Sequence, residues 1–396
     1  MSSNYGVNTV TSADAARPVK IKSTTPIGVV GSAVLTGTEG FYEKVEAGEP
    51  LYFGSAAEAI ESFDGIAGTI REALDGIEDQ NVTCPIIIRP SIITAAHIAA
   101  GSAETFYVDD AVKSSIIDEI NKLKTAASVT GYKPNLIIAP RFTHDLDVST
   151  EVVSVASRLL GTGIVDLNAA DEAAALIARE NFGTSRAILR DPYVKVWDTD
   201  LNASVYQPDS ARVAGMIAAT DAAREYGWAD SFSNRVMLGI SGTKRAIEFN
   251  AGADCEADRL RTKQIGTVIR YNGFRTWGGE TTDIDPIWQD LTRVRVFDRI
   301  AEAGLENFFW AIDRRATDVL KAVKDSVEQM CLALRGAGVL IGYDVWWDPD
   351  LNTKANITAG KFYLKVQMQN SPIVKRLEIN FQYADRWGDV LIKMVA

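Results

Sequence analysis

The sequence predicts an α/β domain built on a mostly parallel sheet, followed by a smaller α+β domain. Two patterns indicate this division. Buried-strand runs alternate with helical patterns up to about residue 250, and two segments near the C-terminal end alternate strictly between apolar and polar residues. The length of 396 residues gives room for two or three domains. With 46% hydrophobic and 23% charged residues, the composition is that of an ordinary globular protein.

The first part of the chain shows the strand–helix alternation of a doubly wound sheet. Near-continuous stretches of Val, Ile, Leu and Ala are typical of strands buried on both faces. The expected strands are 27–35, 84–89, 136–139, 163–167 and 187–189, and the expected helices are 55–63, 66–78, 110–127, 149–160, 171–181 and 209–226. Asp110, Ser149, Asp171 and Asp209 stand where helix N-caps belong.

The last third of the chain follows a different pattern. Residues 291–303 and 317–334 are predicted helices, and the second carries an apolar stripe formed by Leu320, Val323, Val327, Met330 and Leu334. Segments 361–369 and 377–383 then alternate with a period of two, as half-buried antiparallel strands do. Val19 and Ile21, opposite Lys20 and Lys22, repeat this pattern weakly near the N-terminus.

The net charge of −11 belongs entirely to the first part of the chain. Residues 1–250 hold 21 Lys and Arg against 32 Asp and Glu, whereas residues 251–396 hold 20 of each. Negative charge of this size disfavours nucleic acid as the main partner. No segment approaches the roughly 18 unbroken apolar residues of a membrane helix, and residues 1–11 do not resemble a secretory signal. Three isolated cysteines argue against a disulfide framework.

No catalytic or cofactor-binding constellation is apparent in the sequence. Gly28 and Gly31 lie inside an apolar run rather than in a phosphate-binding turn, so packing within a strand is the favoured interpretation. Two histidines and three scattered cysteines provide no zinc spacing, and no nucleophile–base pair is in evidence. We therefore expect no cofactor, no metal and no enzymatic activity. A cytosolic α/β enzyme with a Rossmann-like or flavodoxin-like domain remains the alternative, because doubly wound sheets host unrelated functions.

Several short motifs, densest from about residue 180 onward, resemble the tail sheath proteins of contractile phage tails and of R-type bacteriocins. The residues that carry the resemblance are Gly273, Arg275, Trp277, Gly278, Arg293, Arg295, Trp310, Asp313 and Arg314. One departure is visible. The family usually continues Trp-Gly with Asn-Arg-Thr, whereas this chain has Gly279-Glu280-Thr281.

The resemblance implies a structural subunit. Members of this family form hexameric rings that stack helically around a rigid inner tube, and the sheath contracts to drive the tube through a cell envelope. The expected partners are further copies of the chain, the inner tube protein, and baseplate and terminator proteins. The expected location is a virion or phage-tail-like particle, assembled in the bacterial cytoplasm. Another tail or baseplate component is a second alternative.

The resemblance also implies a role for each part of the chain. An N-terminal arm (1–25) is exchanged with a neighbour, residues 26–250 form an outer α/β domain, 251–372 an inner α+β domain facing the tube, and 373–396 a C-terminal strand or arm. The expected strand-exchange residues are Val19, Ile21, Leu377, Ile379 and Phe381. The expected tube-facing helix presents Lys321, Lys324, Asp325 and Glu328. Six of the eight tryptophans fall in the last third, which favours contact surfaces there.

Overall fold

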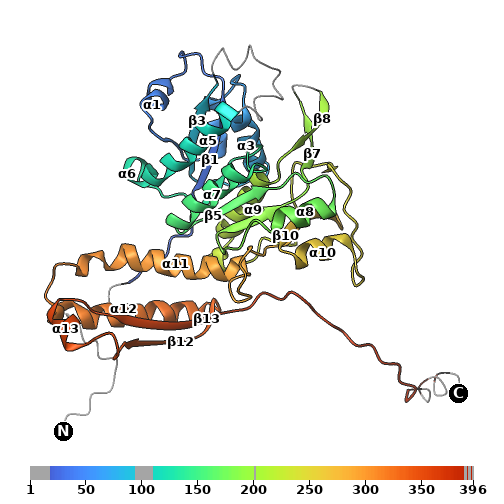
Figure 1. Cartoon of the computed structure of the whole chain (residues 1–396). Coiled ribbons are helices and arrows are strands. Elements are labelled where there is room, and N and C mark those ends of the chain that lie inside the picture. Colours follow the sequence, from blue (N-terminus) through green and yellow to red (C-terminus); the bar gives the residue numbers. More distant parts are fainter. Residues whose placement is uncertain (1–17, 94–109, 200–201, 388–389, 391–393, 395–396) are drawn as a thin grey trace, which may run out of the picture.

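The computed structural model of the chain describes residues 18–93, 110–199, 202–387, 390 and 394. Its largest feature is an eight-stranded sheet in the order β11-β10-β6-β5-β4-β1-β3-β2 (Figure 1). The six inner strands are parallel, and the two edge strands, β2 and β11, are antiparallel to their neighbours. The strands are β1 (Ile27–Ala33), β2 (Leu51–Phe53), β3 (Ile86–Ile92), β4 (Leu136–Ile138), β5 (Thr162–Asp166), β6 (Ala187–Arg190), β10 (Ile265–Arg270) and β11 (Phe274–Trp277).

Helices cover both faces of this sheet, which confirms the doubly wound arrangement. One face packs against α2 (Ala56–Ser62), α3 (Thr69–Glu78) and α9 (Ser210–Ala222), and the other against α5 (Asp110–Lys122), α7 (Leu146–Arg158), α8 (Glu172–Arg179) and α10 (Glu256–Thr262). Strand β1 is buried along its whole length because it lies between β3 and β4 under both helix layers. A Cβ on Gly31 would lie 2.9 Å from Cγ1 of Ile70, so this glycine serves packing, as predicted.

Smaller elements decorate the α/β domain. They are α1 (Tyr42–Glu46), α6 (Ala126–Thr130) and a three-stranded sheet of β7 (Val194–Asp198), β8 (Ala203–Gln207) and β9 (Gly242–Thr243). The sequence did not predict this small sheet. Asp171 caps α8 by accepting a hydrogen bond from the amide of Ala174, as expected. The N-cap of α7 is Asp145 rather than Ser149, because the helix begins one turn earlier than its apolar stripe suggested.

The second domain is a layer of helices packed on a two-stranded antiparallel sheet. It contains α11 (Leu291–Phe308), α12 (Ala316–Gly336), β12 (Leu340–Trp347), α13 (Lys354–Thr358) and β13 (Leu364–Asn370). Figure 1 shows α11 lying between the α/β domain and the layer formed by α12 and the β12–β13 hairpin. Along β13 the exposure alternates: Leu364, Val366 and Met368 pack against the helices, and the lysine and glutamines between them face outward. The alternation predicted for 361–369 is thereby confirmed from Leu364 onward, whereas residues 361–363 precede the strand.

The predicted domain boundary at residue 250 is wrong. Strands β10 and β11 extend the main sheet to Trp277, so the α/β domain continues about 25 residues further and the second domain begins near α11. The change in sequence pattern misled the prediction, since β11 is an edge strand that pairs with β10 on one side and on the other bonds only to the irregular segment 234–237 among the described residues. Edge strands lack the continuous apolar run of buried parallel strands.

At the carboxyl ends of β5 and β6, buried charged side chains connect the strands to the start of α9. One carboxylate oxygen of Asp166 accepts hydrogen bonds from the amides of Asp209 (3.0 Å) and Ser210 (2.9 Å), at the start of α9. The Arg190 Nε donates to Asp209 at 2.6 Å. All four side chains are at most 1% exposed. These bonds join both strands to the start of α9, at the place where many α/β enzymes open a ligand crevice, although the second carboxylate oxygens of Asp166 and Asp209 have no recorded hydrogen-bond partner among the described residues.

Burial, reinforced by the neighbouring carboxylate of Asp209, raises the pKa of Asp166 to about 7. An unfolded chain releases this proton near its ordinary value of about 4, so between about pH 4 and pH 7 the folded state binds more protons. The contribution of Asp166 to stability is therefore full at acid pH and is lost as the pH rises through 7.

We predict that Asp166→Asn removes this pH dependence. Relative to the parent, the variant should gain about 2 kcal/mol in free energy of unfolding between about pH 5 and pH 8. Urea denaturation at the two pH values measures this change. The exposed Asp64, replaced by Asn in the same way, is the control. Parallel pH profiles for parent and Asp166→Asn would contradict the assignment.

Candidate interaction surfaces

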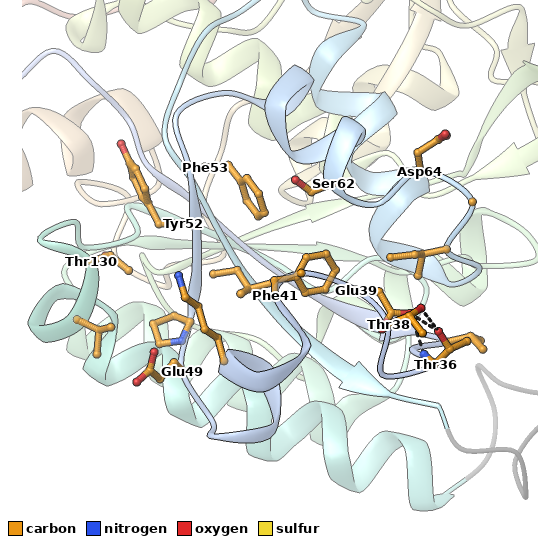
Figure 2. A pocket seen from close by; sticks show the side chains of 18 residues that line it. Thr36, Thr38, Glu39, Phe41, Glu49, Tyr52, Phe53, Ser62, Asp64 and Thr130 are labelled. Atoms are coloured by element: carbon orange, nitrogen blue, oxygen red, sulfur yellow. Dashed lines mark hydrogen bonds between the residues drawn. The ribbon is translucent and has the colours of Figure 1, made fainter.

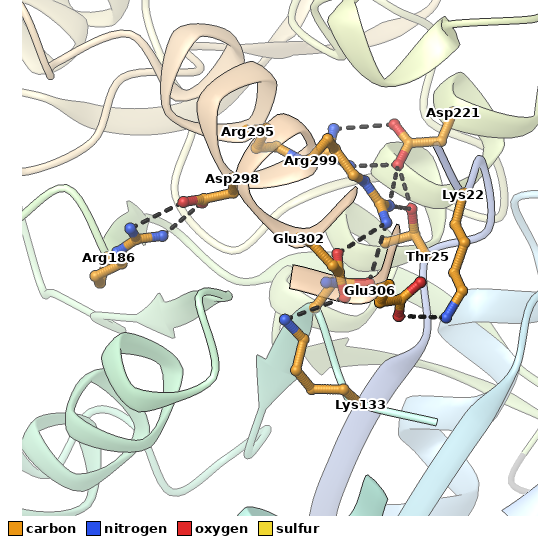
Figure 3. Close-up of polar contacts among 11 residues, drawn as sticks. Lys22, Thr25, Lys133, Arg186, Asp221, Arg295, Asp298, Arg299, Glu302 and Glu306 are labelled. Atoms are coloured by element: carbon orange, nitrogen blue, oxygen red, sulfur yellow. Dashed lines mark hydrogen bonds and ion pairs between the residues drawn. The ribbon is translucent and has the colours of Figure 1, made fainter. Parts of the chain in front are cut away.

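The two domains meet through a row of charged side chains on one face of α11 (Figure 3). Asp298 forms a two-pronged ion pair with Arg186 of the α/β domain, at 2.5 and 2.9 Å. Glu302 lies 3.1 Å from Lys133, and Glu306 lies 2.5 Å from Lys22. The spacing of three to four residues places these side chains on the same side of the helix.

The centre of this junction is Asp221, at the end of α9. Arg295 of α11 forms a two-pronged ion pair with its carboxylate, and Arg299 approaches one carboxylate oxygen at 3.5 Å. The hydroxyl of Thr25 donates to Asp221 and accepts a hydrogen bond from Arg299 at 2.6 Å. Asp221, Thr25, Arg295 and Arg299 are all at most 7% exposed. A segment from the N-terminal part of the chain, a helix of each domain and two positive charges thus converge on one carboxylate.

The pKa shifts in the junction reflect its desolvation. Burial raises the pKa of Asp298, although the neighbouring Arg186 acts in the opposite direction. Burial, with the repulsion of Arg295, lowers the pKa of Arg299 despite the attraction of Asp221. Charges removed from water in this way stabilise a structure only in the geometry that pairs them, so the junction favours one orientation of α11 on the α/β domain.

The N-terminal segment lies against the second domain of its own chain. Residues 1–17 of the expected arm lie outside the described residues. Val19 and Ile21 are half-buried and pack against the apolar cluster of α11 and α12, and the Lys20 amide donates to the Asn307 side chain at 3.3 Å. Residues 18–26 form no strand, so the weak alternation predicted here is not paired within this chain.

The C-terminal segment leaves the body of the molecule after β13 (Figure 1). Residues 377–383 do not form the predicted strand, because none of the strands among the described residues lies beside them to complete the hydrogen bonds. Leu377 is 78% exposed, Ile379 61% and Phe381 89%. Residues 377–383 therefore have the sequence pattern of a strand, but in the structure they form an extended tail whose apolar side chains face water.

The helix predicted at 317–334 is α12, and its charged side faces outward as expected. Val327, Met330 and Leu334 are buried, and Lys321 is exposed. Lys324 pairs with Glu328 one turn along at 3.4 Å, and both remain partly exposed, as does Asp325. At the N-terminal end of the apolar stripe, Val319 is buried, whereas the predicted Leu320 is only half-buried.

The motif residues in the region of β11 stabilise the edge of the main sheet. Arg275 donates to the carbonyl oxygens of Tyr271 (2.9 Å) and Asn234 (2.8 Å). Gly273 and Gly278 have positive φ angles of 102° and 108°. A Cβ on Gly278 would lie 2.8 Å from the Cα of Gly266, so this position requires glycine.

The motif residues of the second domain lie on and beyond α11. Arg293 donates to the Asn370 side chain at 3.0 Å and so joins α11 to the end of β13. Arg295 belongs to the Asp221 junction, and Trp310, Asp313 and Arg314 lie on the connection between α11 and α12. The sequence thus singled out Arg295 but missed its partner Asp221, whose position on α9 carries no distinguishing pattern. The charged residues that recur every three or four positions from Arg295 to Glu306 could have indicated that this face of α11 makes ion pairs, although they do not identify Asp221 as a partner.

A groove of about 840 Å³ on the α/β domain shows no arrangement suited to catalysis (Figure 2). Its wall includes Phe41, Phe53 and Tyr52. The carboxylate of Glu39 accepts hydrogen bonds from the amides of Thr36 (2.8 Å) and Gly37 (2.9 Å), and the pKa of Glu39 falls to about 2, chiefly through the bond from the Thr36 amide. The ionised carboxylate of Glu39 therefore stabilises the loop of residues 36–39. Among the described residues, no group of acidic, His and Cys side chains could hold a metal, and no helix is long and apolar enough to cross a membrane.

Comparison with known proteins decides the family. Residues 115–282 match the phage tail sheath protein central domain, and residues 283–383 match the phage tail sheath C-terminal domain. A putative prophage major tail sheath protein of Pseudomonas aeruginosa is 32% identical over 98% of both chains. The chain belongs to the phage tail sheath protein family. The tail sheath protein of Escherichia phage P2 is 24% identical to this sheath protein over 99% of the chain and 98% of its own length.

Solved structures show the same fold. The contracted helical sheath of the anti-feeding prophage matches this sheath protein with a TM-score of 0.66 at 21% identity, covering 97% of this chain and all of its own. The contracted sheath of an extracellular contractile injection system matches with a TM-score of 0.69 at 15% identity, covering 98% and 99%. This sheath protein is thus a structural tail subunit by family, which argues against the alternative of a Rossmann-like enzyme.

We predict that Asp221→Ala destabilises the sheath protein by about 3–5 kcal/mol, because it leaves Arg295 and Arg299 buried without their shared counter-charge. Urea unfolding of the purified subunit measures the loss. Asp230→Ala, which removes an ion pair with the largely exposed Arg224, should cost less than about 1 kcal/mol. Equal losses in the two variants would show that the junction contributes no more than a surface pair.

Proposed function

We propose that this chain is the repeating subunit of a contractile sheath, in which six copies form each ring and the rings stack helically around a rigid inner tube. The α/β domain faces outward and the second domain faces the tube. The baseplate and terminator proteins hold the two ends of the stack. The observation that carries the proposal is the tail beyond β13, whose alternating apolar side chains are largely exposed and are not covered by the part of the chain that the structure describes.

The two-stranded sheet of β12 and β13 is a suitable acceptor for such a segment. Two strands alone are marginally stable in water, and addition of a further strand supplies backbone hydrogen bonds and covers an edge. The contact residues proposed for strand exchange are Leu377, Ile379 and Phe381 in the C-terminal arm, and Val19 and Ile21 in the N-terminal arm. Because backbone pairing survives rotation of the attached domains, neighbouring subunits stay connected while the sheath shortens.

We also propose that the protein has no enzymatic activity and needs no cofactor or metal. The family is one of structural tail proteins, and the charged residues at the carboxyl edge of the main sheet are engaged with one another. Function as a baseplate component is the second candidate, since a baseplate structure of the anti-feeding prophage matches with a TM-score of 0.68 at 19% identity. The length of the assembly formed by purified subunits distinguishes the two, because a sheath extends into tubes.

We predict that a chain lacking residues 1–22 folds but builds no sheath that survives dilution. Within it, the described residues 18–22 add two half-buried apolar side chains and one ion pair to the second domain, so circular dichroism should change little and the thermal unfolding temperature should fall only modestly. Truncation after Pro372 should have the same effect on assembly. Electron microscopy of diluted samples measures the outcome, with the full chain as control. Stable tubes from the shortened chains would contradict the role of the arms.

We predict that Lys321→Glu with Lys324→Glu weakens assembly of the sheath around tubes. Exposed ion pairs contribute only about 0–1 kcal/mol each, so contacts of this kind hold the tube in sum and release it without exposing apolar surface. Co-sedimentation with tubes at low and high salt measures the effect, which salt should mimic in the parent. Lys44→Glu with Lys263→Glu makes the same charge change on the α/β domain and should leave co-sedimentation unchanged. Equal loss in both double variants would place the tube contact elsewhere.

A further inference from the structure

The C-terminal tail contacts the α/β domain shortly after it leaves the second domain. The tail leaves the second domain at the end of β13, where the Ser371 amide donates to the carbonyl oxygen of Val339 at 2.8 Å. Four residues on, the Lys375 ammonium lies 3.1 Å from the carboxylate of Glu280. Within the described segment 372–387, the other recorded polar and ring contacts join tail residues to each other. The tail therefore crosses from one domain to the other before it runs outward (Figure 1).

Glu280 is a fixed acceptor for this contact. Its side chain is only 10% exposed, and Arg261 donates to the same oxygen that faces Lys375, at 3.1 and 3.2 Å. The second oxygen accepts a hydrogen bond from the Gly279 amide at 2.8 Å. Arg261 itself stacks on the ring of Trp277 at 4.7 Å. Three hydrogen bonds thus hold the carboxylate in place without the tail, and the stacking on Trp277 fixes Arg261.

Glu280 is also ionised. Burial raises its pKa, but the positive charges of Arg261 and Lys375 outweigh this effect, and the pKa is lowered on balance. Lys375 on the tail, which carries the opposite charge, therefore faces an ionised partner.

Apolar packing does not hold the tail here. Tail residues 375–378 form one wall of a groove of about 920 Å³, whose other side includes Phe249, Trp277 and Arg261. The tail bridges this groove rather than filling it, and Leu377 remains 78% exposed. The contact that fixes the path of the tail is consequently the ion pair between Lys375 and Glu280.

We infer that the ion pair between Glu280 and Lys375 positions the base of the C-terminal arm, so that residues 377–383 project in a fixed direction toward a second copy of this chain. The inference rests on the proposed strand exchange and names the residues that aim the strand. Without the ion pair, the five residues from Pro372 to Arg376 form a free linker, and the strand reaches its acceptor at a lower effective concentration. Glu280 and Lys375 are positioning residues, since neither lies in the exchanged strand.

The test compares three variants of the full chain. Lys375→Glu breaks the pair, Lys375→Arg preserves its charge, and Arg376→Glu makes the same charge reversal at a neighbouring residue that pairs only within the tail. Because Glu280 keeps Arg261 in each variant, the fold of the body is retained. Two measurements are made on each protein: the distance between spin labels attached at Ala253→Cys and Asn380→Cys in the unassembled subunit, and the critical concentration for assembly.

We expect a narrow label distance in the parent, in Lys375→Arg and in Arg376→Glu, and a broad distribution in Lys375→Glu. The critical concentration should rise about fivefold in Lys375→Glu and change little in the other two. A narrow distribution in Lys375→Glu, equal broadening in Arg376→Glu, or broadening without an effect on assembly would each overturn the inference. Failure of the parent itself to assemble would instead contradict the proposed function, and the label distances would still report on the ion pair.

Discussion

The structure depends on one buried carboxylate shared by two arginines. Asp221 lies at the end of a helix of the α/β domain, and Arg295 and Arg299 reach it from α11 of the second domain. Apolar interfaces tolerate sliding, whereas buried charges are stabilised only when paired, so this junction selects one orientation of the domains. Every surface proposed for assembly is placed by that orientation: the hairpin below α11, the outward face of α12, and the paths of both chain ends.

The contacts within this subunit differ in kind from the surfaces proposed for contact between subunits, and the difference suits a sheath protein. The contacts within a subunit are buried and specific, as at Asp221 and at Asp166. The surfaces proposed for contact between molecules are an unpaired strand and exposed charges on α12. The exposed charges form and break contacts in water at small cost, whereas a paired strand keeps neighbouring subunits connected. A subunit built in this way keeps its own shape while its neighbours change position around it.

The sequence predicted those parts of the fold that local patterns determine. Continuous apolar runs predicted five of the six parallel strands, and the alternation at Leu364, Val366 and Met368 predicted β13. The boundary near residue 250 was wrong, because membership of a sheet at β10 and β11 depends on long-range pairing. The segment 377–383 has the alternating pattern of a strand, but a strand needs a neighbour, and the described residues of this chain provide none. The pairing of Asp221 with Arg295 spans 74 residues, and no local pattern reveals it.

The central claim is that the exposed C-terminal segment is a strand of a sheet shared between copies of this chain. A cryo-electron microscopy reconstruction of tubes assembled from the purified protein tests it most directly. The account predicts that residues 377–383 of one subunit lie hydrogen-bonded along the β12–β13 hairpin of a neighbour, with Leu377, Ile379 and Phe381 facing its helices. A reconstruction in which this segment folds back on its own subunit, or lies free in solvent between firmly joined subunits, would contradict it.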